Sequence, residues 1–544
     1  MSRLVFDLET NNLLPKVSKL HCLGITDVDT GESFVFNDEM DVDGEPIEAG
    51  LEMLDKAEVI IGHNIINYDL PVLDKLRGWK PDTSIRDTLV MSRLIHADIR
   101  DEDFVRRAKK IDNDFPSKLI GSHSLKAWGY RVGQLKGSFK EQHGFDVWCP
   151  EMEEYCIQDT KITAELFRSF EAKNYSEISI ELEHMFALIM TMQELRGFCF
   201  DVPAANRLYG ELAGEKLGLD SQLEEIFPPK EIQMKSTFWK AGDRLFETKT
   251  AAIASGFKPA EVSKGPHKIK RIPFNPTSRD HIAERLMGMG WKPQEFTESG
   301  KPKVDESVLS GLPYDEAQML SKILTLQKRM GQLGDGKEGW LKLETKGRIH
   351  GHVVTNGAVT GRCTHRHPNM AQVPRLTSYR SLFKATDGMV LVGCDASGLE
   401  LRCLAHYMND DEYTHKLLEE DIHTVNQHAA GLPNRDNAKT FIYGFLYGAG
   451  DAKIGEIIGR GAKEGREIKE KFLKSLPSLR VLKEKISSAL KKRDYLKGLD
   501  GRHLHVRSEH SALNTLLQSA GAVVMKRATV ILFNKLTAMG LVPN

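Results

Sequence analysis

The stretch LVFDLE, residues 4–9, decides the fold class of the first part of the chain because it alternates apolar and acidic side chains. Successive side chains of a strand point to opposite faces, so Asp7 and Glu9 share one face with Val5, and the apolar residues between them share the other. Two carboxylates side by side repel each other unless a cation lies between them. The stretch therefore predicts a strand with one buried face and a cation site on the other.

Further oxygen donors follow along the chain. A second predicted strand, EVIIGHN, ends a few residues before Asp69, and the stretch YCIQD places Tyr155 and Asp159 on one face of a helix. Carboxylate oxygens suit the hard ions Mg²⁺ and Mn²⁺. Asp87 directly precedes a helical pattern, so we predict that it caps this helix and is not a ligand.

The acids DxE, then YD, then YxxxD, in this order, resemble the DEDD-type 3′–5′ exonucleases of the ribonuclease-H-like fold, and the tyrosine is typical of the DEDDy branch. A lone DxE is an ordinary strand edge and a lone YxxxD an ordinary helix face, so only the ordered set is specific. The resemblance implies one ion that generates hydroxide and one that stabilises the leaving oxygen. It assigns the role of metal ligand to Asp7, Glu9, Asp69 and Asp159. Tyr155 would orient the attacking water.

A second site begins in VLVGCDASGLELRCL, residues 390–404. Its apolar run predicts a buried strand that delivers Asp395 at its end, with Glu400 five positions later. Metal sites that handle phosphate usually need two or more acids, so Asp395 needs a partner.

The stretch RDNAKTFIYGFLYGAG, residues 435–450, repeats a functional side chain every four residues, which makes a stripe on a helix. Arg435 and Lys439 suit a triphosphate, and Tyr443 offers a flat face to a base. The alternative is a solvated helix with an aromatic packing stripe.

The stretches DASGLELR, DIHT and RxxxKxxxYG in this order resemble family A DNA polymerases, in particular the replicative polymerases of short-tailed phages. TGRCTHRHPNMAQVP, SALNTLLQSAGA and FNPTSRDHIAERL resemble further motifs of that family. Glu400, which would exclude a ribose, argues against the related single-subunit RNA polymerases.

The resemblance assigns a role to each motif residue. Asp395 would bind both catalytic metals, Tyr443 would stack near the new base pair, and Glu400 would close the pocket against a 2′-hydroxyl. The triphosphate would be held by Arg435, Lys439 and His423. The primer–template would be contacted by Arg362, Asn514 and Gln518.

The expected fold is α/β and α+β multidomain, with a ribonuclease-H-like exonuclease domain followed by a right-hand polymerase domain that lacks its C-terminal palm strands. The expected boundaries are 1–172 for the exonuclease, 173–340 for the thumb and connecting region, 341–410 for the first part of the palm, 411–500 for the fingers and 501–544 for the incomplete palm return. We further expect a β-rich patch in 348–362, a hairpin in 499–508, one long final helix over 511–540, and an exposed loop over 258–278, which holds four prolines and five basic residues.

One part of the family pattern is missing. Family A polymerases carry a second metal-binding aspartate in a His-Asp-Glu hairpin after the helix of Gln518, and the residues after Gln518 include no Asp or Glu. Three explanations remain: a truncated or interrupted reading frame, a split polymerase whose palm is completed by a second polypeptide, or a polymerase half that binds DNA without synthesis.

Composition limits the class of protein. Seven scattered cysteines without a CxxC pair argue against a disulfide framework or a zinc ribbon and favour the cytoplasm, here that of a bacterial host if the chain is of phage origin. Net charge is −1, but residues 462–507 carry 14 Lys/Arg against 6 Asp/Glu, which suits either DNA or a solvated helical surface. The longest apolar stretch noted, 185–192, is too short to span a bilayer.

Three functions are compatible with the sequence. The first is a DNA polymerase with proofreading that uses primer–template DNA, deoxynucleoside triphosphates and two Mg²⁺ (or Mn²⁺) ions per active site. The second is an exonuclease with a non-synthesising DNA-binding module, and the third is a DNA-binding scaffold, against which the four acids speak. Residues 226–275 are expected to be compact, which gives no docking loop for a processivity factor.

Overall fold

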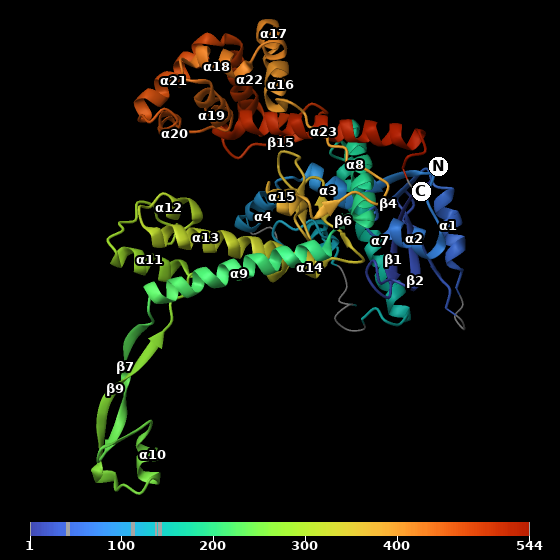
Figure 1. Ribbon diagram of the computed structural model, residues 1–544. Coiled ribbons are helices and arrows are strands. Elements are labelled where there is room, and N and C mark those ends of the chain that lie inside the picture. Colours follow the sequence, from blue (N-terminus) through green and yellow to red (C-terminus); the bar gives the residue numbers. More distant parts are fainter. Residues whose placement is uncertain (1, 40–43, 110–114, 136–138, 140–143, 543–544) are drawn as a thin grey trace. The chain divides into compact units, whose positions relative to one another are not determined.

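The computed structural model describes residues 2–39, 44–109, 115–135, 139 and 144–542. The chain divides into two compact units (Figure 1). Unit 1 consists of Met1–Arg196, Gly351–Arg366 and Val392–Asn544, and unit 2 consists of Gly197–His350 and His367–Leu391.

A five-stranded sheet of unit 1 has the order β3-β2-β1-β4-β5. β1 is antiparallel to β2 and parallel to β4, and β4 is parallel to β5. The strands are β1 (Arg3–Thr10), β2 (Leu20–Asp27), β3 (Ser33–Asn37), β4 (Val59–Gly62) and β5 (Ser84–Asp87). Leu4, Phe6 and Leu8 lie in one core of this sheet, which confirms the alternation expected for residues 4–9. The mixed α/β class is confirmed as well.

Helices of the same part cover both faces of the sheet. They are α1 (Ile47–Asp55), α2 (Asp69–Arg77), α3 (Thr88–Ile95), α4 (Ile99–Ala108), α5 (Leu125–Val132), α7 (Pro150–Glu171) and α8 (Glu177–Arg196). Asp87 accepts hydrogen bonds from the N–H groups of Leu89 and Val90, so it caps α3 as predicted. The hydroxyls of Thr160 on α7 and Thr26 on β2 are 2.7 Å apart, which fixes α7 across β1 and β2.

The rest of unit 1 is mainly helical and has its own apolar core. Its helices are α16 (Leu399–Met408), α17 (Asp411–Glu419), α18 (Ile422–Ala430), α19 (Arg435–Leu446), α20 (Asp451–Glu456), α21 (Ala462–Ser475), α22 (Pro477–Lys492) and α23 (Ala512–Ala538). Two short pairs of strands are β11 (His352–Val354) with β12 (Thr364–Arg366), and β14 (Tyr495–Lys497) with β15 (His503–His505). The expected β-rich patch, hairpin and long final helix are thus confirmed.

A buried charge cluster, Glu183–Lys526–Arg502–Asp500, ties these parts together. The Lys526 ammonium on α23 lies 2.7 Å from Glu183 Oε1 on α8, and Arg502 Nη2 lies 2.8 Å from the same oxygen. Arg502 also pairs with Asp500 at 2.7 Å. Such a cluster is stable only when every charge has a partner, so it fixes α8, α23 and the β14–β15 turn in register.

Unit 2 contains a three-stranded sheet of β6 (Phe198–Phe200), β10 (Arg348–Ile349) and β13 (Phe383–Lys384). Its helices are α9 (Val202–Ile226), α10 (Lys249–Ala254), α11 (Arg279–Gly288), α12 (Glu306–Ser310), α13 (Asp315–Met330), α14 (Trp340–Leu343) and α15 (Thr377–Arg380). Ser278 caps α11 through its hydroxyl, as its sequence position predicts.

The expected exposed loop over 258–278 is wrong in part. Residues Val262–Ile272 form β9, which pairs with β7 (Lys230–Ala241) in a long ribbon that carries β8 (Arg244–Phe246) and α10 at its far end (Figure 1). The β7–β9 register is irregular near Thr237 and His267, next to Pro266, and such an irregularity accommodates a residue that cannot donate to the ladder.

The expected buried strand before Asp395 is also wrong. Residues 389–395 form no strand, and Met389, Val390, Leu391 and Val392 are 60–89% exposed. An apolar run becomes a strand only when another strand pairs with it, and no described segment pairs with this one.

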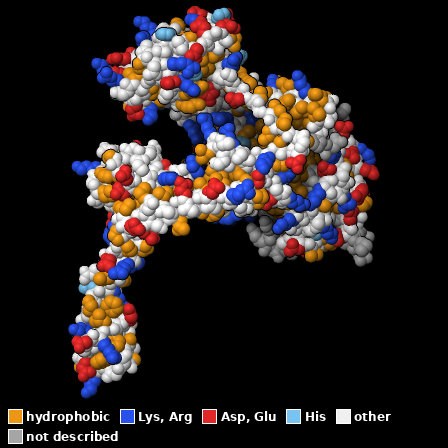
Figure 2. All heavy atoms as spheres, viewed as in Figure 1, with side chains coloured by type: hydrophobic (Ala, Val, Ile, Leu, Met, Phe, Trp, Pro, Cys, Tyr) orange, Lys and Arg blue, Asp and Glu red, His pale blue; other side chains and the backbone are white. Residues whose placement is uncertain are grey.

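Two surface properties bear on function. In Figure 2 the blue Lys and Arg side chains of the helical part that contains α21 and α22 stand beside red acidic ones, and Lys469 pairs with Asp451 at 2.9 Å.

One described helix, Glu509–Ala538, is long and apolar enough to span a membrane by length and composition. Of its apolar 18-residue stretch, 39% is buried within the protein.

Candidate active sites

The first site lies on the face of β1 that α7 covers. Carboxylate oxygens of Asp7 and Glu9 and the Cys156 sulfur lie within 4.8 Å of one another. Glu9 is 7% exposed, and Asp7 is partly exposed. The side-by-side acids inferred from the alternation of β1 are therefore close enough to share a cation.

Asp69 is the first residue of α2, the helix that follows β4, which is the parallel neighbour of β1. Its carboxylate accepts the backbone N–H of Leu8, which lies between Asp7 and Glu9. Burial, together with the negative charge of Asp87, raises the pKa of the Asp69 carboxyl to about 7. A buried acid with this environment favours a cation partner, because a cation would offset the cost of burying its charge.

Asp87 stabilises this arrangement through hydrogen bonds to the segment between β4 and α2. Its carboxylate accepts the N–H groups of Asn64, at 2.9 Å, and Ile66, at 3.1 Å, and so holds the turn that leads into α2. The Asp87 N–H donates to His184 Nε2 on α8 at 2.7 Å. Asp87 thus orders the turn before α2 in addition to capping α3.

α7 supplies the other predicted residues. Asp159 is 2% exposed, and it lies one turn from Cys156 on the helix face toward the sheet. Tyr155 is half-buried, with its ring packed 5.4 Å from Phe139. The structure thus gathers Asp7, Glu9 and Asp69 at β1 and sets Tyr155 and Asp159 on the helix that packs over it.

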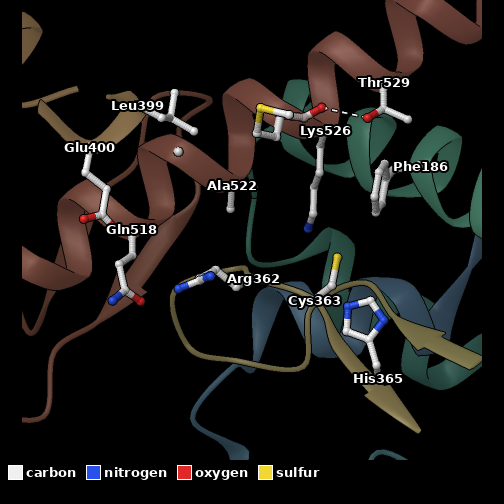
Figure 3. A pocket seen from close by; sticks show the side chains of 12 residues that line it. Phe186, Arg362, Cys363, His365, Leu399, Glu400, Gln518, Ala522, Lys526 and Thr529 are labelled. Carbon is white, nitrogen blue, oxygen red and sulfur yellow. Dashed lines mark hydrogen bonds between the residues drawn. The ribbon is translucent and has the colours of Figure 1, made fainter. Parts of the chain in front are cut away.

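The second site is a cavity of about 320 Å³ in unit 1. Three predicted residues line it from different elements: Arg362 from the segment before β12, Glu400 from α16 and Gln518 from α23. Figure 3 shows Arg362 pointing toward Gln518, with Glu400 above the same end. The far end is lined by Phe186, His365 and Thr529, with Lys526 between. Residues separated by more than 150 positions in sequence therefore meet at one concave surface, where two donors and a carboxylate can contact a nucleic acid.

Glu400 is held by Tyr447, the residue that directly follows α19. The Tyr447 hydroxyl donates to both carboxylate oxygens, at 2.9 and 3.0 Å. Tyr443 lies beside Tyr447, with ring centroids 6.4 Å apart. The stripe on residues 435–447 forms as predicted, and Tyr447 has a polar contact that the sequence did not indicate.

The basic end of α19 is also partnered. Arg435 Nη2 donates to Asp421 Oδ1 at 3.1 Å, and Lys439 is exposed. His423 is half-buried and its ring lies 6.3 Å from Tyr443. Burial lowers the pKa of His423, and the nearby Arg435 charge lowers it further. His423 is therefore neutral at pH 7 and can accept or donate one hydrogen bond at a phosphate.

Six predicted polymerase residues do not line this cavity: Arg435, Lys439, His423, Tyr443, Asp395 and Asn514. Asp395 is exposed in the segment without a strand, and no cluster of three close metal-ligating side chains among the described residues includes it. Asn514 lies one turn before Gln518 on α23, and its buried Oδ1 has no hydrogen-bond partner within the described part of the chain. The donors present near Asp395 do not fit a two-ion centre.

Four residues were missed by sequence reasoning: Cys156, Tyr68, Asp421 and Lys526. Tyr68 precedes Asp69, and its hydroxyl forms a hydrogen bond with the Thr10 hydroxyl. Burial raises the pKa of Tyr68, and the negative charges of Asp69, Glu9 and Asp7 add to this effect. Lys526 interrupts an apolar stretch, and this was a usable signal because a buried lysine needs a partner. Asp421 and Cys156 lie within the motifs DIHT and YCIQD, and no pattern in the sequence marks them as functional residues by themselves.

Comparisons with known proteins identify the family of the chain. A family model described as DNA polymerase family A matches residues 250–542. The DNA-directed DNA polymerase of Enterobacteria phage T3 is 39% identical over 96% of this chain and 88% of its own length, and that of Escherichia phage T7 is 38% identical over the same shares. The thermostable DNA polymerase I of Thermus aquaticus is 30% identical over 61% of this chain and 43% of its own.

A solved structure shares the fold. The polymerase domain of Pol1 from M. smegmatis, in complex with DNA primer-template and dNTP, superposes with a TM-score of 0.71 at 16% identity, over 99% of this chain and 88% of that one. The family model covers more than half of the chain, and the T3 and T7 relatives cover almost all of it. The chain therefore belongs to DNA polymerase family A, and it is a DNA-directed DNA polymerase of the type that these phages encode.

Proposed function

We propose that the chain replicates DNA, in a phage genome, by template-directed addition of deoxynucleotides, and that it removes mispaired 3′ ends at a separate exonuclease site. The observation that supports the exonuclease activity is the position of Asp7 and Glu9 on one face of β1, beneath α7, with the Asp69 carboxylate bonded to the Leu8 N–H between them. Single-stranded ends suit this site, since a mispaired end costs less to unpair than a matched one.

Asp7, Glu9, Asp69 and Asp159 fit a pair of Mg²⁺ or Mn²⁺ ions, because all four are oxygen donors and three are nearly fully buried. When bound, such ions polarise the scissile phosphodiester and the attacking water. The chain's own part is to fix the acids on rigid elements and to hold the water with the Tyr155 hydroxyl, whose ring is packed against Phe139.

For synthesis, Arg362 and Gln518 contact the primer–template next to the Glu400 cavity, with Asn514 one turn along α23. The Lys439 and Arg435 side chains and the neutral His423 hold the triphosphate, and Tyr443 stacks on the new base pair. Arg435 exchanges its pairing with Asp421 for the phosphate.

Glu400, fixed by Tyr447, excludes a ribose through its position against the 2′ carbon. The primer 3′-hydroxyl then displaces pyrophosphate from the α-phosphorus.

Synthesis also needs an acid that works with Asp395. The apolar side chains of residues 389–392 stand exposed, as a strand without its neighbour would leave them. We propose that a polypeptide segment carrying the His-Asp hairpin pairs with residues 389–395, completes the palm sheet and brings the second carboxylate to Asp395. We also propose the domain boundaries that the sequence indicates, at 1–172, 173–340, 341–410, 411–500 and 501–544.

Two assays on the full chain test the proposal. Degradation of 5′-labelled single-stranded DNA with Mg²⁺ is expected for the chain alone, and the double variant Asp7→Ala/Glu9→Ala should lose it by at least about a thousandfold. The matched control Glu52→Ala, an exposed acid on α1, should keep it. Unchanged degradation by the double variant would refute the exonuclease assignment.

Primer extension distinguishes the polymerase from an exonuclease with a DNA-binding module. Extension should appear when a polypeptide with the His-Asp hairpin is added to the chain, and Asp395→Ala should abolish it. Failure to extend under these conditions would favour the second function.

A further inference from the structure

Two thiols lie among the acids of the exonuclease site. On β2, Cys22 pairs with Glu9 and Gly24 pairs with Asp7, so the side chains of each pair share a face of the sheet. Cys156 on α7 lies over Gly24: its sulfur is 2.8 Å from the position that a Cβ of Gly24 would occupy, and its S–H donates to the Asp7 carbonyl at 3.3 Å. The absence of a side chain at Gly24 leaves room for the Cys156 sulfur close to the two acids.

The Cys156 sulfur is a donor of a different chemical class from its neighbours. The Cys156 side chain is fully buried and packs with Cys22, Phe139 and Met152, next to the carboxylates. Mg²⁺ and Mn²⁺ are oxygen-seeking ions, whereas thiolates select Zn²⁺ and its heavier relative Cd²⁺. Two carboxylates and a thiolate within 4.8 Å of one another supply three of the four ligands of a tetrahedral zinc ion, and water can supply the fourth on the exposed side of Asp7.

We infer that the Asp7–Glu9–Cys156 cluster binds a thiophilic divalent cation, Zn²⁺ or Cd²⁺, which competes with Mg²⁺ for the two carboxylates and stops degradation of DNA. The binding step breaks the Cys156 S–H bond, forms a sulfur–metal bond with the sulfur electron pair and releases the proton to the buffer. No oxidant or reductant takes part. The inhibitory consequence rests on the proposed exonuclease function, whereas the binding itself does not.

Ultraviolet absorption tests the binding directly. Adding Cd²⁺ alone to the full chain should produce a thiolate-to-cadmium charge-transfer band with a stoichiometry of one, and Cys156→Ser should lose this band. Two matched variants should keep it: Cys22→Ser, a buried thiol in the same apolar cluster, and Cys403→Ser, a buried thiol on α16. A band that persists in Cys156→Ser, or one lost equally in Cys22→Ser, overturns the assigned donor set. Circular dichroism of each variant checks that it is folded.

Inhibition tests the consequence. Each variant's degradation of single-stranded DNA is expressed relative to its own rate with Mg²⁺ alone, and the Zn²⁺ concentration for half inhibition should rise at least about tenfold in Cys156→Ser but not in Cys403→Ser. Equal zinc sensitivity of these two variants would overturn the inhibitory role. A Cys156-dependent cadmium band in a chain that degrades no DNA would leave the cation site standing and refute the proposed exonuclease function.

Discussion

Replacement of Lys526 by methionine tests the charge cluster that supports the cavity of Arg362 and Gln518. The Lys526 ammonium lies 2.7 and 2.8 Å from the two oxygens of Glu183, 2.7 Å from the Thr355 carbonyl and 2.8 Å from the Gly361 carbonyl. Gly361 directly precedes Arg362 in the chain. Lys526 therefore connects α23 and α8 to the backbone that presents Arg362.

The expected cost of Lys526→Met follows from these contacts. Methionine keeps most of the stem volume, so the cavity left is small. Breaking a buried ion pair by removal of one partner costs about 3–5 kcal/mol, and Arg502 still reaches Glu183 at 2.8 Å, so we expect about 4 kcal/mol when the two carbonyls that lose their donor are included. This corresponds to an equilibrium constant for opening about a thousandfold larger.

Hydrogen exchange of the α23 amides, followed by mass spectrometry, measures this opening without requiring the whole chain to unfold in one step. The control Lys535→Met, an exposed lysine on the same helix, should change the free energy of opening by less than about 0.5 kcal/mol. The double variant Lys526→Met/Glu183→Leu should cost less than Lys526→Met alone, because no buried charge is then left partly paired. Two results would refute this account of the cluster. One is a change below about 1 kcal/mol in Lys526→Met, and the other is a double variant whose cost equals the sum of the costs of Lys526→Met and Glu183→Leu.

Three further predictions concern single sites. Glu400→Ala should raise incorporation of ATP relative to dATP about tenfold, measured as the ratio of kcat/KM values, since the acid held by Tyr447 no longer meets the 2′-hydroxyl; an unchanged ratio would refute the gate. Burial lowers the pKa of His184 to about 4, below its usual 6.5, so its contribution to stability is complete above pH 6.5 and declines as the pH falls to 4. The difference in free energy of unfolding between the wild type and His184→Gln should accordingly shrink from pH 7.5 to pH 5, and a constant difference would contradict this assignment. Gly24→Ala should cost about 1–3 kcal/mol through contact with the Cys156 sulfur, and Cys156→Ala in the same chain should recover part of it in denaturant titrations; no recovery would show that the contact is not the cause.

The sequence predicted elements whose signals are local. The alternation around Asp7 and Glu9, the caps at Asp87 and Ser278 and the long final helix depend on neighbours within a few residues, and all are confirmed. The meeting of Arg362, Glu400 and Gln518 at one cavity follows from order-specific motifs, which carry three-dimensional information that composition lacks.

The failures have a common physical reason. Residues 390–395 have the composition of a buried strand, and residues 262–272 have that of a loop, but strand formation depends on a partner elsewhere in the chain. Described segments offer no partner to the first, whereas β7 pairs with the second in spite of Pro266. Cys156 was missed for the same reason, because only the register that sets Gly24 opposite Asp7 brings its sulfur close to the acids.

We propose that the acids on β1 hold divalent cations against DNA. Electron paramagnetic resonance of Mn²⁺ added to the full chain counts bound ions directly, without dependence on catalysis. We predict that the wild type and Glu52→Ala bind Mn²⁺ equally and that Asp7→Ala/Glu9→Ala loses the ions of this site. Equal Mn²⁺ binding by the wild type and the double variant would contradict the account.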